Sequence, residues 1–327
     1  MWLHYAALIL GTACTIAVIL PVAQTRIWWV RIFDFPKLQL IGLLMLAIAL
    51  YAYTTPTPWL WIDGALLTLF TISLLRLCYD IYPFTPLGRT QVPTQHNTSD
   101  TTLSLLVSNV RVLNGHIAEL WNKVLDVDSD VVLLMETTQE WDAQKPDEID
   151  ERYPHQCTHP AGDGKGMMLF SKYPLKDDKV RFLDNQDVPS IDSYIEVSEP
   201  LPPIRFYGIH PEPPAPTFRD ENRFEELYAI ANELASSKEP SIVCGDLNEP
   251  CWSRITQTFL IRSQMRNPRQ GRGLYCTFHA KLPFMRWPLD HIFLSSHFTL
   301  RTFERMKMPG SDHFALHTTL NVKQPDA

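Results

Sequence analysis

Three long apolar segments near the N-terminus constrain this 327-residue chain more than any other feature of its sequence. They cover residues 3–23, 38–53 and 59–79, and Asp63 and Arg76 are the only Asp, Glu, Lys or Arg residues within them. A helix needs about 20 apolar residues to cross about 30 Å of hydrocarbon, and each segment is close to that length, although the second is short. We therefore expect transmembrane helices instead of a buried helical hairpin in a soluble domain.

Aromatic residues and the lack of a basic leader agree with this expectation. No Lys or Arg precedes the first segment, so it lacks the basic region of a cleaved signal peptide and is expected to remain as an anchor. Aromatic rings flank the segments, where they can lie at the level of the lipid headgroups. These rings are Trp28, Trp29, Trp59, Trp61, Tyr79 and Tyr82.

Charge divides the chain into two parts. Residues 1–99 carry 5 basic and 3 acidic residues, whereas residues 100–327 carry 24 basic and 33 acidic residues, a net charge of −9. With 45% hydrophobic and 20% charged residues, the chain can bury a core, which excludes a disordered protein. Its 6 cysteines are too sparse for a disulfide scaffold, and none forms a C-x-x-C pair of the kind that binds zinc.

The distribution of basic residues predicts an orientation in the membrane. The loop between the first two apolar segments carries Arg26, Arg31 and Lys37, whereas the loop over 54–58 carries no charge. Short cytoplasmic loops are enriched in Lys and Arg. The first loop, and everything after the third segment, is therefore expected on the cytoplasmic side of a multi-pass inner-membrane protein.

The pattern of the remaining residues predicts a linker followed by an α/β domain. Residues 83–100 are rich in Pro, Thr, Gln and Asn and are expected to link a three-helix region over 1–82 to a domain over 101–323. Helices are predicted over 116–125 and 222–234, where apolar residues recur on one face. Strands are predicted over 103–109, 131–136, 167–171, 191–197, 204–210, 241–245 and 290–294.

Polar residues follow several of the predicted strands. Asn109, Glu136 and His210 each end an apolar strand, and Asp246 and Asn248 come after another strand and a glycine. Side chains two residues apart on an extended backbone point the same way, so Asp246 and Asn248 can face one point. A strand fixes its last side chain while the next loop leaves it open to a ligand, which is typical of an active site.

Two Asp-His pairs, Asp290-His291 and Asp312-His313, lie near the C-terminus. Carboxylates with amides and imidazoles, and without thiolates, suit Mg²⁺ or Mn²⁺ better than Zn²⁺. They also suit hydrolysis of a phosphoester, in which a metal neutralises phosphate charge and a carboxylate positions the attacking water. Any one of these residues alone is more often a turn former or a structural residue, so the inference depends on the whole set.

Seven short segments occur in a characteristic order. They are LVSN (106–109), LLME (133–136), GMMLFS (166–171), GIHP (208–211), GDLN (245–248), LDHI (289–292) and SDH (311–313). Together they resemble the endonuclease/exonuclease/phosphatase family, which has the DNase I-like fold, over about residues 100–323. The resemblance implies an α/β fold, a four-layer αββα sandwich, preceded here by an all-α transmembrane region similar to that of some bacterial members.

The same resemblance implies a metal site for Mg²⁺ or Mn²⁺. Glu136 matches the metal-binding carboxylate of the family, and Asp312 matches a second carboxylate on the metal side. Asn109 matches the amide beside the metal carboxylate, so the resemblance implies that it helps to hold the metal together with Glu136 and Asp312 and that it also contacts the substrate.

Catalytic roles are implied in the same way. Asp246 and Asn248 match the pair that positions the attacking water and the scissile phosphate. His210 matches a histidine that contacts the phosphate. His313 matches the catalytic histidine, and Asp290 matches the carboxylate that orients it; a carboxylate in this position fixes the imidazole tautomer and raises its basicity.

Three other features carry no family role. His291 is expected to be structural, and Asn114 is expected to structure a loop. Between Glu249 and Asp290 the chain has seven basic and no acidic residues. This stretch either faces a phosphate-rich partner, nucleic acid or an anionic lipid surface, or pairs with the acidic segment 126–151.

Three functions remain open at this point. The first is a membrane-anchored, divalent-metal phosphodiesterase that acts as a nuclease. The second is the same chemistry applied to a lipid or small phosphoester, as in a sphingomyelinase or an inositol phosphatase, which membrane anchoring favours. The third is an inactive family member that serves as a membrane-bound interaction module, against which the complete set of acids and imidazoles argues.

Overall fold

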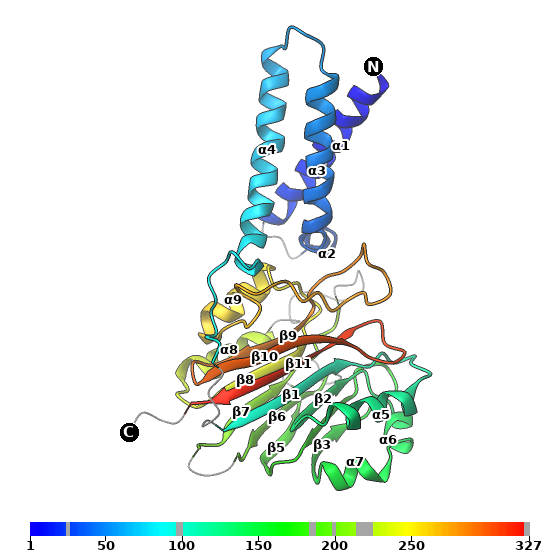
Figure 1. Cartoon of the computed structure of the whole chain (residues 1–327), viewed down its shortest axis with the longest axis vertical. Coiled ribbons are helices and arrows are strands. Elements are labelled where there is room, and N and C mark those ends of the chain that lie inside the picture. The colour runs from blue at the N-terminus through cyan, green and yellow to red at the C-terminus, as the bar shows by residue number, and fades with distance from the viewer. Residues whose placement is uncertain (24–26, 96–100, 183–187, 198–200, 214–224, 324–327) are drawn as a thin grey trace.

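The computed structural model (Figure 1) describes residues 1–23, 27–95, 101–182, 188–197, 201–213 and 225–323. A bundle of long N-terminal helices stands on an α/β domain built around two sheets. The bundle contains α1 (Trp2–Ile19), α3 (Lys37–Thr54) and α4 (Trp61–Ile81). Short helical turns join them, namely η1 (Leu20–Ala23), α2 (Trp28–Arg31), η2 (Ile32–Asp34) and, after α4, η3 (Tyr82–Phe84).

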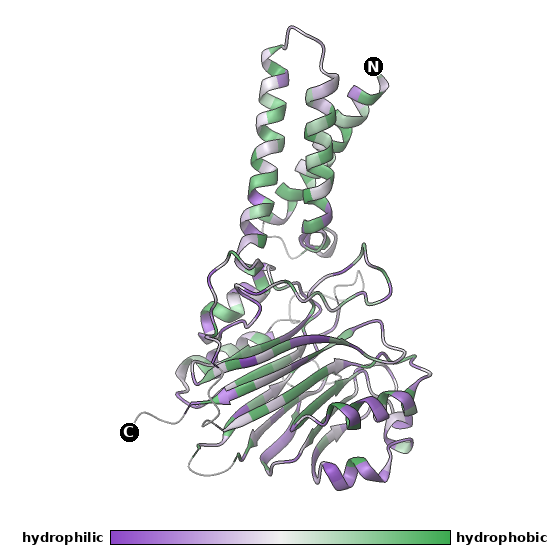
Figure 2. Cartoon of the chain, in the orientation of Figure 1, coloured by the Kyte–Doolittle hydropathy of each residue, from purple (hydrophilic) through white to green (hydrophobic). Residues whose placement is uncertain are grey.

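Most side chains on the outside of the helical bundle are apolar. Three segments, Trp2–Val22, Lys37–Thr54 and Trp61–Phe84, are long and apolar enough to cross a membrane, and only 28%, 28% and 22% of them are buried within the structure. Leu44 and Phe70 are among the few side chains buried between the helices. Figure 2 shows hydrophobic residues along the whole length of these helices. An outer surface of this kind is costly in water and suits lipid tails.

The turns between α1 and α3 hold the bundle on the α/β domain. The indole Nε1 of Trp252 donates to the carbonyl of Asp34 at 2.7 Å, and the indole lies edge-on to the ring of Phe84. The guanidinium of Arg31 forms an ion pair with the carboxylate of Glu249, and both side chains are largely buried. The junction therefore combines apolar packing with a buried ion pair.

Among the described residues, the α/β domain contains a six-stranded sheet, in the order β10-β11-β1-β2-β4-β3, and a five-stranded sheet, in the order β5-β6-β7-β8-β9. The first sheet consists of β1 (Thr102–Asn109), β2 (Val131–Met135), β3 (His155–His159), β4 (Met167–Ser171), β10 (Phe298–Lys307) and β11 (Phe314–Val322). The second consists of β5 (Leu175–Arg181), β6 (Ser190–Ile195), β7 (Ile204–Gly208), β8 (Ser241–Asp246) and β9 (Asp290–Leu294). The pairs β1–β2 and β7–β8 are parallel, so the carboxyl ends within each pair lie side by side.

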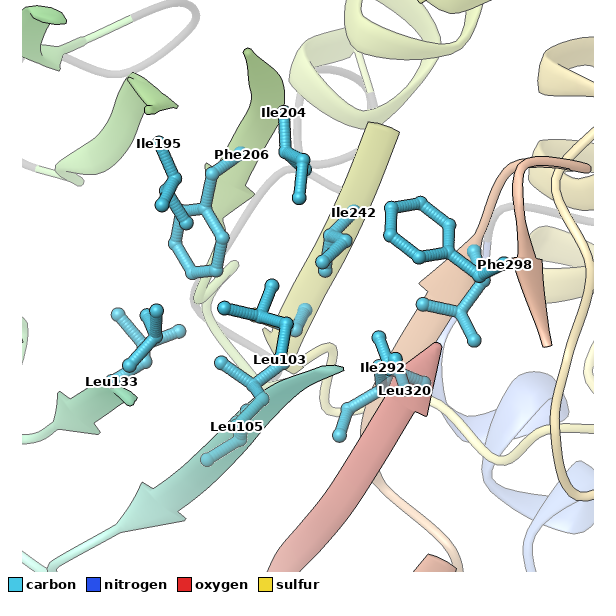
Figure 3. Close-up of a cluster of buried hydrophobic side chains, with 14 of the residues drawn as sticks. Leu103, Leu105, Leu133, Ile195, Ile204, Phe206, Ile242, Ile292, Phe298 and Leu320 are labelled. Carbon is cyan, nitrogen blue, oxygen red and sulfur yellow. The ribbon is translucent and has the colours of Figure 1, made fainter. Parts of the chain in front are cut away.

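Apolar side chains between the two sheets form the main core (Figure 3). Successive residues of a strand point to opposite faces, and central strands such as β1, β2 and β8 carry apolar residues on both faces. Leu133 of β2 and Ile242 of β8 point into this core, whereas their neighbours Leu134 and Val243 point to the outer faces. The side chains of these strands therefore pack against the opposite sheet on one face and against a layer of helices on the other.

Helices cover the outer face of each sheet. The apolar side of α5 (Ile117–Val127) packs on the first sheet through Leu120 and Trp121, next to α6 (Gln139–Ala143) and α7 (Asp147–Arg152). On the second sheet lie α8 (Glu225–Ser236) and α9 (Arg254–Ser263), which bury Ile230 and Phe259. The expected fold class, a DNase I-like four-layer sandwich preceded by an all-α region, is confirmed.

The structure adds several elements to those predicted from the sequence. All seven predicted strands are present with small shifts at their ends, but β3, β5, β10 and β11 were not predicted. The helix expected over 222–234 is observed from Glu225 to Ser236, and residues 222–224 lie outside the described part of the chain.

Residues 83–95 lie against the α/β domain. Arg272 donates to the carbonyl of Val92 at 2.6 Å, and the N–H of Gln95 donates to the carbonyl of Leu300 at 3.0 Å. The expected linker is thus bound to the domain along most of its length, while its last residues, 96–100, are not among those described.

Replacing Trp252 by Ala is expected to destabilise the full-length protein. The substitution removes a buried indole and its hydrogen bond to Asp34, and loss of a buried aromatic side chain costs about 3–5 kcal/mol. The midpoint of thermal unfolding in detergent should fall by roughly 5–15 °C for a chain of this size. Trp252→Phe keeps a ring in place and should lose less. Equal midpoints for the wild type and the Ala variant would contradict the packing described.

Candidate active site

The ends of four strands bring most of the predicted site residues together. Asn109 ends β1 and Glu136 follows β2, so both lie at the same edge of the first sheet. Asp246 ends β8, and Asp290 begins the neighbouring strand β9 directly opposite it. Because the two sheets pack face to face, these edges meet at one end of the sandwich.

The carboxamide of Asn109 connects the two sheets. Its Nδ2 donates to Glu136 Oε1 at 2.8 Å and to Asp246 Oδ2 at 3.1 Å. Its Oδ1 accepts from the N–H of Arg111 at 2.9 Å, which holds the amide in this orientation. The second oxygen of Glu136 accepts from the N–H of Val112 at 2.8 Å. Two carboxylates from different sheets are therefore held by one amide nitrogen.

The turn after β8 requires an unusual backbone. Gly245 has a φ of +143°, and a Cβ at this position would lie 1.8 Å from the carbonyl oxygen of Ile209, so only glycine fits. Asn248 has a φ of +51°, in the left-handed region that Asn tolerates. Its N–H donates to Asp246 Oδ1 at 2.9 Å, and its Nδ2 donates to the carbonyl of Pro211 at 3.0 Å. The turn thereby fixes both side chains of the predicted pair.

His313 and Asp290 form a buried dyad. The Nδ1 of His313 donates to Asp290 Oδ2 at 2.8 Å, and its Nε2 lies 3.7 Å from Asp246 Oδ2. The hydroxyl of Ser311 donates to the carbonyl of Asn109 at 2.7 Å and accepts from the N–H of His313 at 2.9 Å. One serine therefore ties the loop that carries the histidine to the end of β1.

Burial and charge set the protonation of this group. Burial alone would lower the pKa of His313, but the carboxylates of Asp290 and Asp246 outweigh it and raise this pKa to about 10. Burial alone would raise the pKa of Asp246, yet the imidazoles of His313 and His210 help to hold it below its usual range. Burial raises the pKa of Asp290, which His313 offsets in part. At neutral pH the cluster therefore holds an imidazolium beside an ionised Asp246.

His210 and Asp312 complete the group. His210 Nε2 lies 4.0 Å from Asp246 Oδ2. Asp312 Oδ2 lies 3.7 Å from Nε of Arg111. The backbone N–H of Arg111 donates to Oδ1 of Asn109. Contacts thus link all eight predicted positions at one edge of the sandwich.

Three residues of this site carry no recognisable signal in the sequence. Arg111 brings a positive charge to the site and faces Asp312. Thr277 Oγ1 accepts from the N–H of Asp290 at 3.1 Å, and the ring of Phe278 lies 4.9 Å from that of His313. All three come from loops, and their positions depend on contacts far along the chain.

Asn114 and His291 make structural contacts. Asn114 Nδ2 donates to the carbonyls of Val110 and Pro309, at 2.8 and 2.9 Å, and so joins two loops. His291 is fully buried with Nε2 2.8 Å from the carbonyl of Glu249. Burial lowers the pKa of His291 to about 3, so this imidazole stays neutral.

The donors around Glu136 fit a hard divalent cation. Mg²⁺ keeps several waters and usually takes one or two protein carboxylates. Within the described residues, no Lys, Arg or His side chain forms an ion pair with Glu136, so its charge is left without a counter-ion. Asp246, Asp290 and His313 also place ligand atoms within 4.8 Å of one another. There, however, the imidazolium already supplies positive charge, which favours Glu136 as the cation-binding carboxylate.

The basic stretch between Glu249 and Asp290 organises loops. Arg269 is fully buried and donates to the carbonyls of Leu274 and Asp290. Arg272, Lys281 and Arg286 likewise donate to backbone carbonyls. All residues of this stretch and of the acidic segment 126–151 are described, and no ion pair joins the two. Arg269 and Arg272 therefore hold loops together and do not form an open phosphate-binding surface, and the stretch is not a partner of the acidic segment.

The sequence of residues 106–313 matches the Endonuclease/Exonuclease/phosphatase family. The match covers more than half of the chain, which therefore belongs to this family, as its motifs predict. Enzymes of this family are generally phosphoester hydrolases and typically depend on divalent metals. A comparison with curated proteins found no match.

Solved structures share the fold of the α/β domain. The human Nocturnin catalytic domain with a bound sulfate anion is 18% identical, with a TM-score of 0.56 over 68% of this chain and 96% of that one. A family protein from Bacteroides thetaiotaomicron is 16% identical, with a TM-score of 0.54 over 69% and 100% of the two chains. One from Beutenbergia cavernae is 15% identical, with a TM-score of 0.54 over 68% and 72%. At these identities the likeness establishes the fold alone.

His313 is expected to make the folded state sensitive to alkaline pH. Because its pKa is raised from 6.5 to about 10, the stabilisation it provides is complete below pH 6.5 and is lost as the pH rises toward 10. With EDTA present, the unfolding midpoint of the wild type should fall more steeply between pH 7 and pH 10 than that of His313→Gln. Parallel curves would show that this imidazole does not hold the extra proton.

Proposed function

We propose that this protein is a membrane-anchored phosphoesterase that uses Mg²⁺ or Mn²⁺ to hydrolyse phosphoester bonds by attack of water. The observation that carries the proposal is the convergence of Glu136 and Asp246 on the amide of Asn109, beside the Asp290–His313 dyad. An inactive interaction module has no need to bury several acids and imidazoles together, because each buried charge costs free energy unless it is compensated.

Glu136 would bind the cation, with Asp312 as the second carboxylate, and the bound cation would neutralise phosphate charge. In this role the Asn109 amide nitrogen would hold Glu136 and Asp246 in place beside the cation and the substrate. The assignment is supported by the lack of a cationic partner for Glu136 among the described residues and by the preference of Mg²⁺ for oxygen ligands.

The remaining steps use groups of the chain itself. Asp246 is ionised and fixed by the N–H of Asn248, so it would orient the water and accept its proton. Asn248 and His210 would hold the phosphate oxygens. His313, oriented by Asp290 and protonated at neutral pH, would stabilise the charge that develops on the phosphate and donate its proton to the oxygen that leaves when the ester P–O bond breaks.

The membrane region, residues 1–82, would anchor the catalytic domain, residues 101–323, through the segment 83–100. Contacts of Arg31 and Asp34 with the α/β domain support a common side for the first loop and this domain. The excess of Lys and Arg in that loop favours the cytoplasm for this side and supports our proposal of a multi-pass inner-membrane enzyme.

Nucleic acid and lipid or small phosphoesters are the two substrate classes to be compared. Because Arg269 and Arg272 of the basic stretch bind backbone carbonyls inside loops, the sequence argument for a nuclease is weaker. Anchoring at a bilayer favours a lipid substrate, because it raises the effective concentration of headgroups.

A substrate panel should identify the reaction. Purified full-length protein is expected to hydrolyse at least one of plasmid DNA, RNA, phospholipid vesicles or inositol phosphates with Mg²⁺ or Mn²⁺, and to lose this activity with chelator. Release of phosphate or of a phosphorylated headgroup from vesicles, without nicking of DNA, would select the lipid class. Failure on every substrate, together with no metal binding by calorimetry, would reject the enzyme.

Two site variants separate metal binding from acid catalysis. His313→Ala should lower turnover by about 10²–10⁴, the usual effect of losing a general acid or base, and leave metal binding in place. Glu136→Gln should abolish both activity and the calorimetric metal signal. Glu148→Gln, on the exposed side of α7, is the matched control and should match the wild type. An unchanged rate in His313→Ala would remove this residue from the mechanism.

A further inference from the structure

An open groove separates the loop before β9 from the start of α3. Its volume is about 410 Å³, and Leu38, Pro283 and Phe284 line one part of it while Arg286 and Arg305 line another. The groove is closed on one side by a direct contact, in which Nε2 of Gln39 donates to the carbonyl of Phe284 at 2.7 Å. In Figure 1 this orange loop rises beside α2 and the lower end of α3.

Two guanidiniums share one aromatic ring in this groove. Arg286 and Arg305 lie 5.1 and 4.2 Å from the ring centroid of Phe314. They donate to backbone carbonyls, Arg305 to Cys276 at 2.6 Å and Arg286 to Ala280 at 3.0 Å. Among the residues that the structure describes, neither forms an ion pair with a carboxylate.

Two neighbouring cations without a counter-ion repel each other. Burial and then the charge of Arg286 lower the pKa of Arg305, which is the electrostatic sign of this repulsion. An anion between the two guanidiniums would relieve it, and planar guanidinium forks bind phosphate oxygens well.

The apolar part of the groove lies at the end of a candidate membrane span. Gln39 belongs to the first turn of α3, so its contact with Phe284 brings the tip of the loop level with the start of that apolar helix. Phe284 is 87% exposed, and Leu282 and Met285 beside it are exposed as well. Apolar side chains exposed next to a membrane helix suit contact with lipid.

We propose that this groove binds an acidic phospholipid, with the headgroup phosphate between Arg286 and Arg305 and the acyl chains leaving past Leu38 and Phe284 into the bilayer. The charge pair selects an anionic headgroup, and the continuity of the apolar wall with α3 selects a lipid over a soluble anion.

The lipid site is distinct from the candidate active site. Phe314 directly follows His313, and successive residues of an extended chain point to opposite sides, so the arginines and the dyad lie on different sides of this segment. The same loop contributes Phe278, whose ring contacts His313. A lipid in the groove would therefore hold this loop at the membrane. The same loop packs against His313 of the candidate active site.

Lipid binding to the full-length protein in a neutral detergent tests the proposal. Phosphatidylglycerol is added, and the rise in the unfolding midpoint with lipid concentration gives an apparent Kd. Phosphatidylcholine and inorganic phosphate are expected to give little or no rise. The double variant R286Q/R305Q should weaken phosphatidylglycerol binding by about 10–100-fold, because the charged hydrogen bonds to the headgroup phosphate are lost.

Two further variants keep the test decisive. Arg301→Gln, an exposed position of β10 outside the groove, should bind like the wild type. Phe284→Asp changes an exposed side chain, keeps the backbone carbonyl that Gln39 uses, and should also weaken binding, so it decides the matter if the double variant does not fold.

Three outcomes would overturn the proposal. They are unchanged phosphatidylglycerol binding in the folded variants, an equal response to inorganic phosphate, and an RNA oligonucleotide that binds in the lipid's place and depends on the same arginines. The measurement is of binding alone, so it is independent of whether the proposed hydrolase activity is found.

Discussion

The amide of Asn109 is the contact on which the site depends. It holds Glu136 at the edge of one sheet and Asp246 at the edge of the other, and two carboxylates this close would repel each other without a shared donor. The amide can do this only because the interlocked side chains of the core fix the distance between the sheets. Ser311 extends the arrangement, since it binds the Asn109 carbonyl and positions His313. The packing of the two sheets, the positions of the carboxylates and the protonation of the imidazole therefore depend on one another.

The N-terminal helical bundle contacts the loop that carries part of the candidate site. Glu249 directly follows Asn248, and its carboxylate pairs with Arg31 in the turns between α1 and α3 while its carbonyl meets the imidazole of His291. Trp252, three residues further on, binds the same turns. The loop that carries the proposed water-positioning pair is thus clamped between the helical bundle and the second sheet. The contacts that join the helical bundle to the α/β domain therefore also hold part of the candidate site.

Much of the α/β domain can be predicted from the sequence because its central strands are buried on both faces and carry apolar residues on each. The strands that escaped prediction are mostly at sheet edges: β3, β5 and β10 are each the last strand of a sheet. An edge strand meets solvent, so β5 carries Lys176, Asp177 and Asp178 in sequence and shows no apolar period. The basic stretch before β9 was equally ambiguous, because the chemistry of an arginine does not show whether it will meet a phosphate or a carbonyl.

Residue order and type alone determined the family, the apolar helices and the acids, amides and imidazoles that gather at the site, because these depend on local pattern and on motifs carried by single strands. Tertiary structure alone decided which of these groups touch, which of them stay charged, and how the helical bundle joins the domain. The pKa of His313, the bridging role of Asn109 and the paired arginines beside α3 all arise from side chains far apart in the chain. Electrostatic and hydrogen-bond energies depend on distance and burial in space, and only the folded chain sets these.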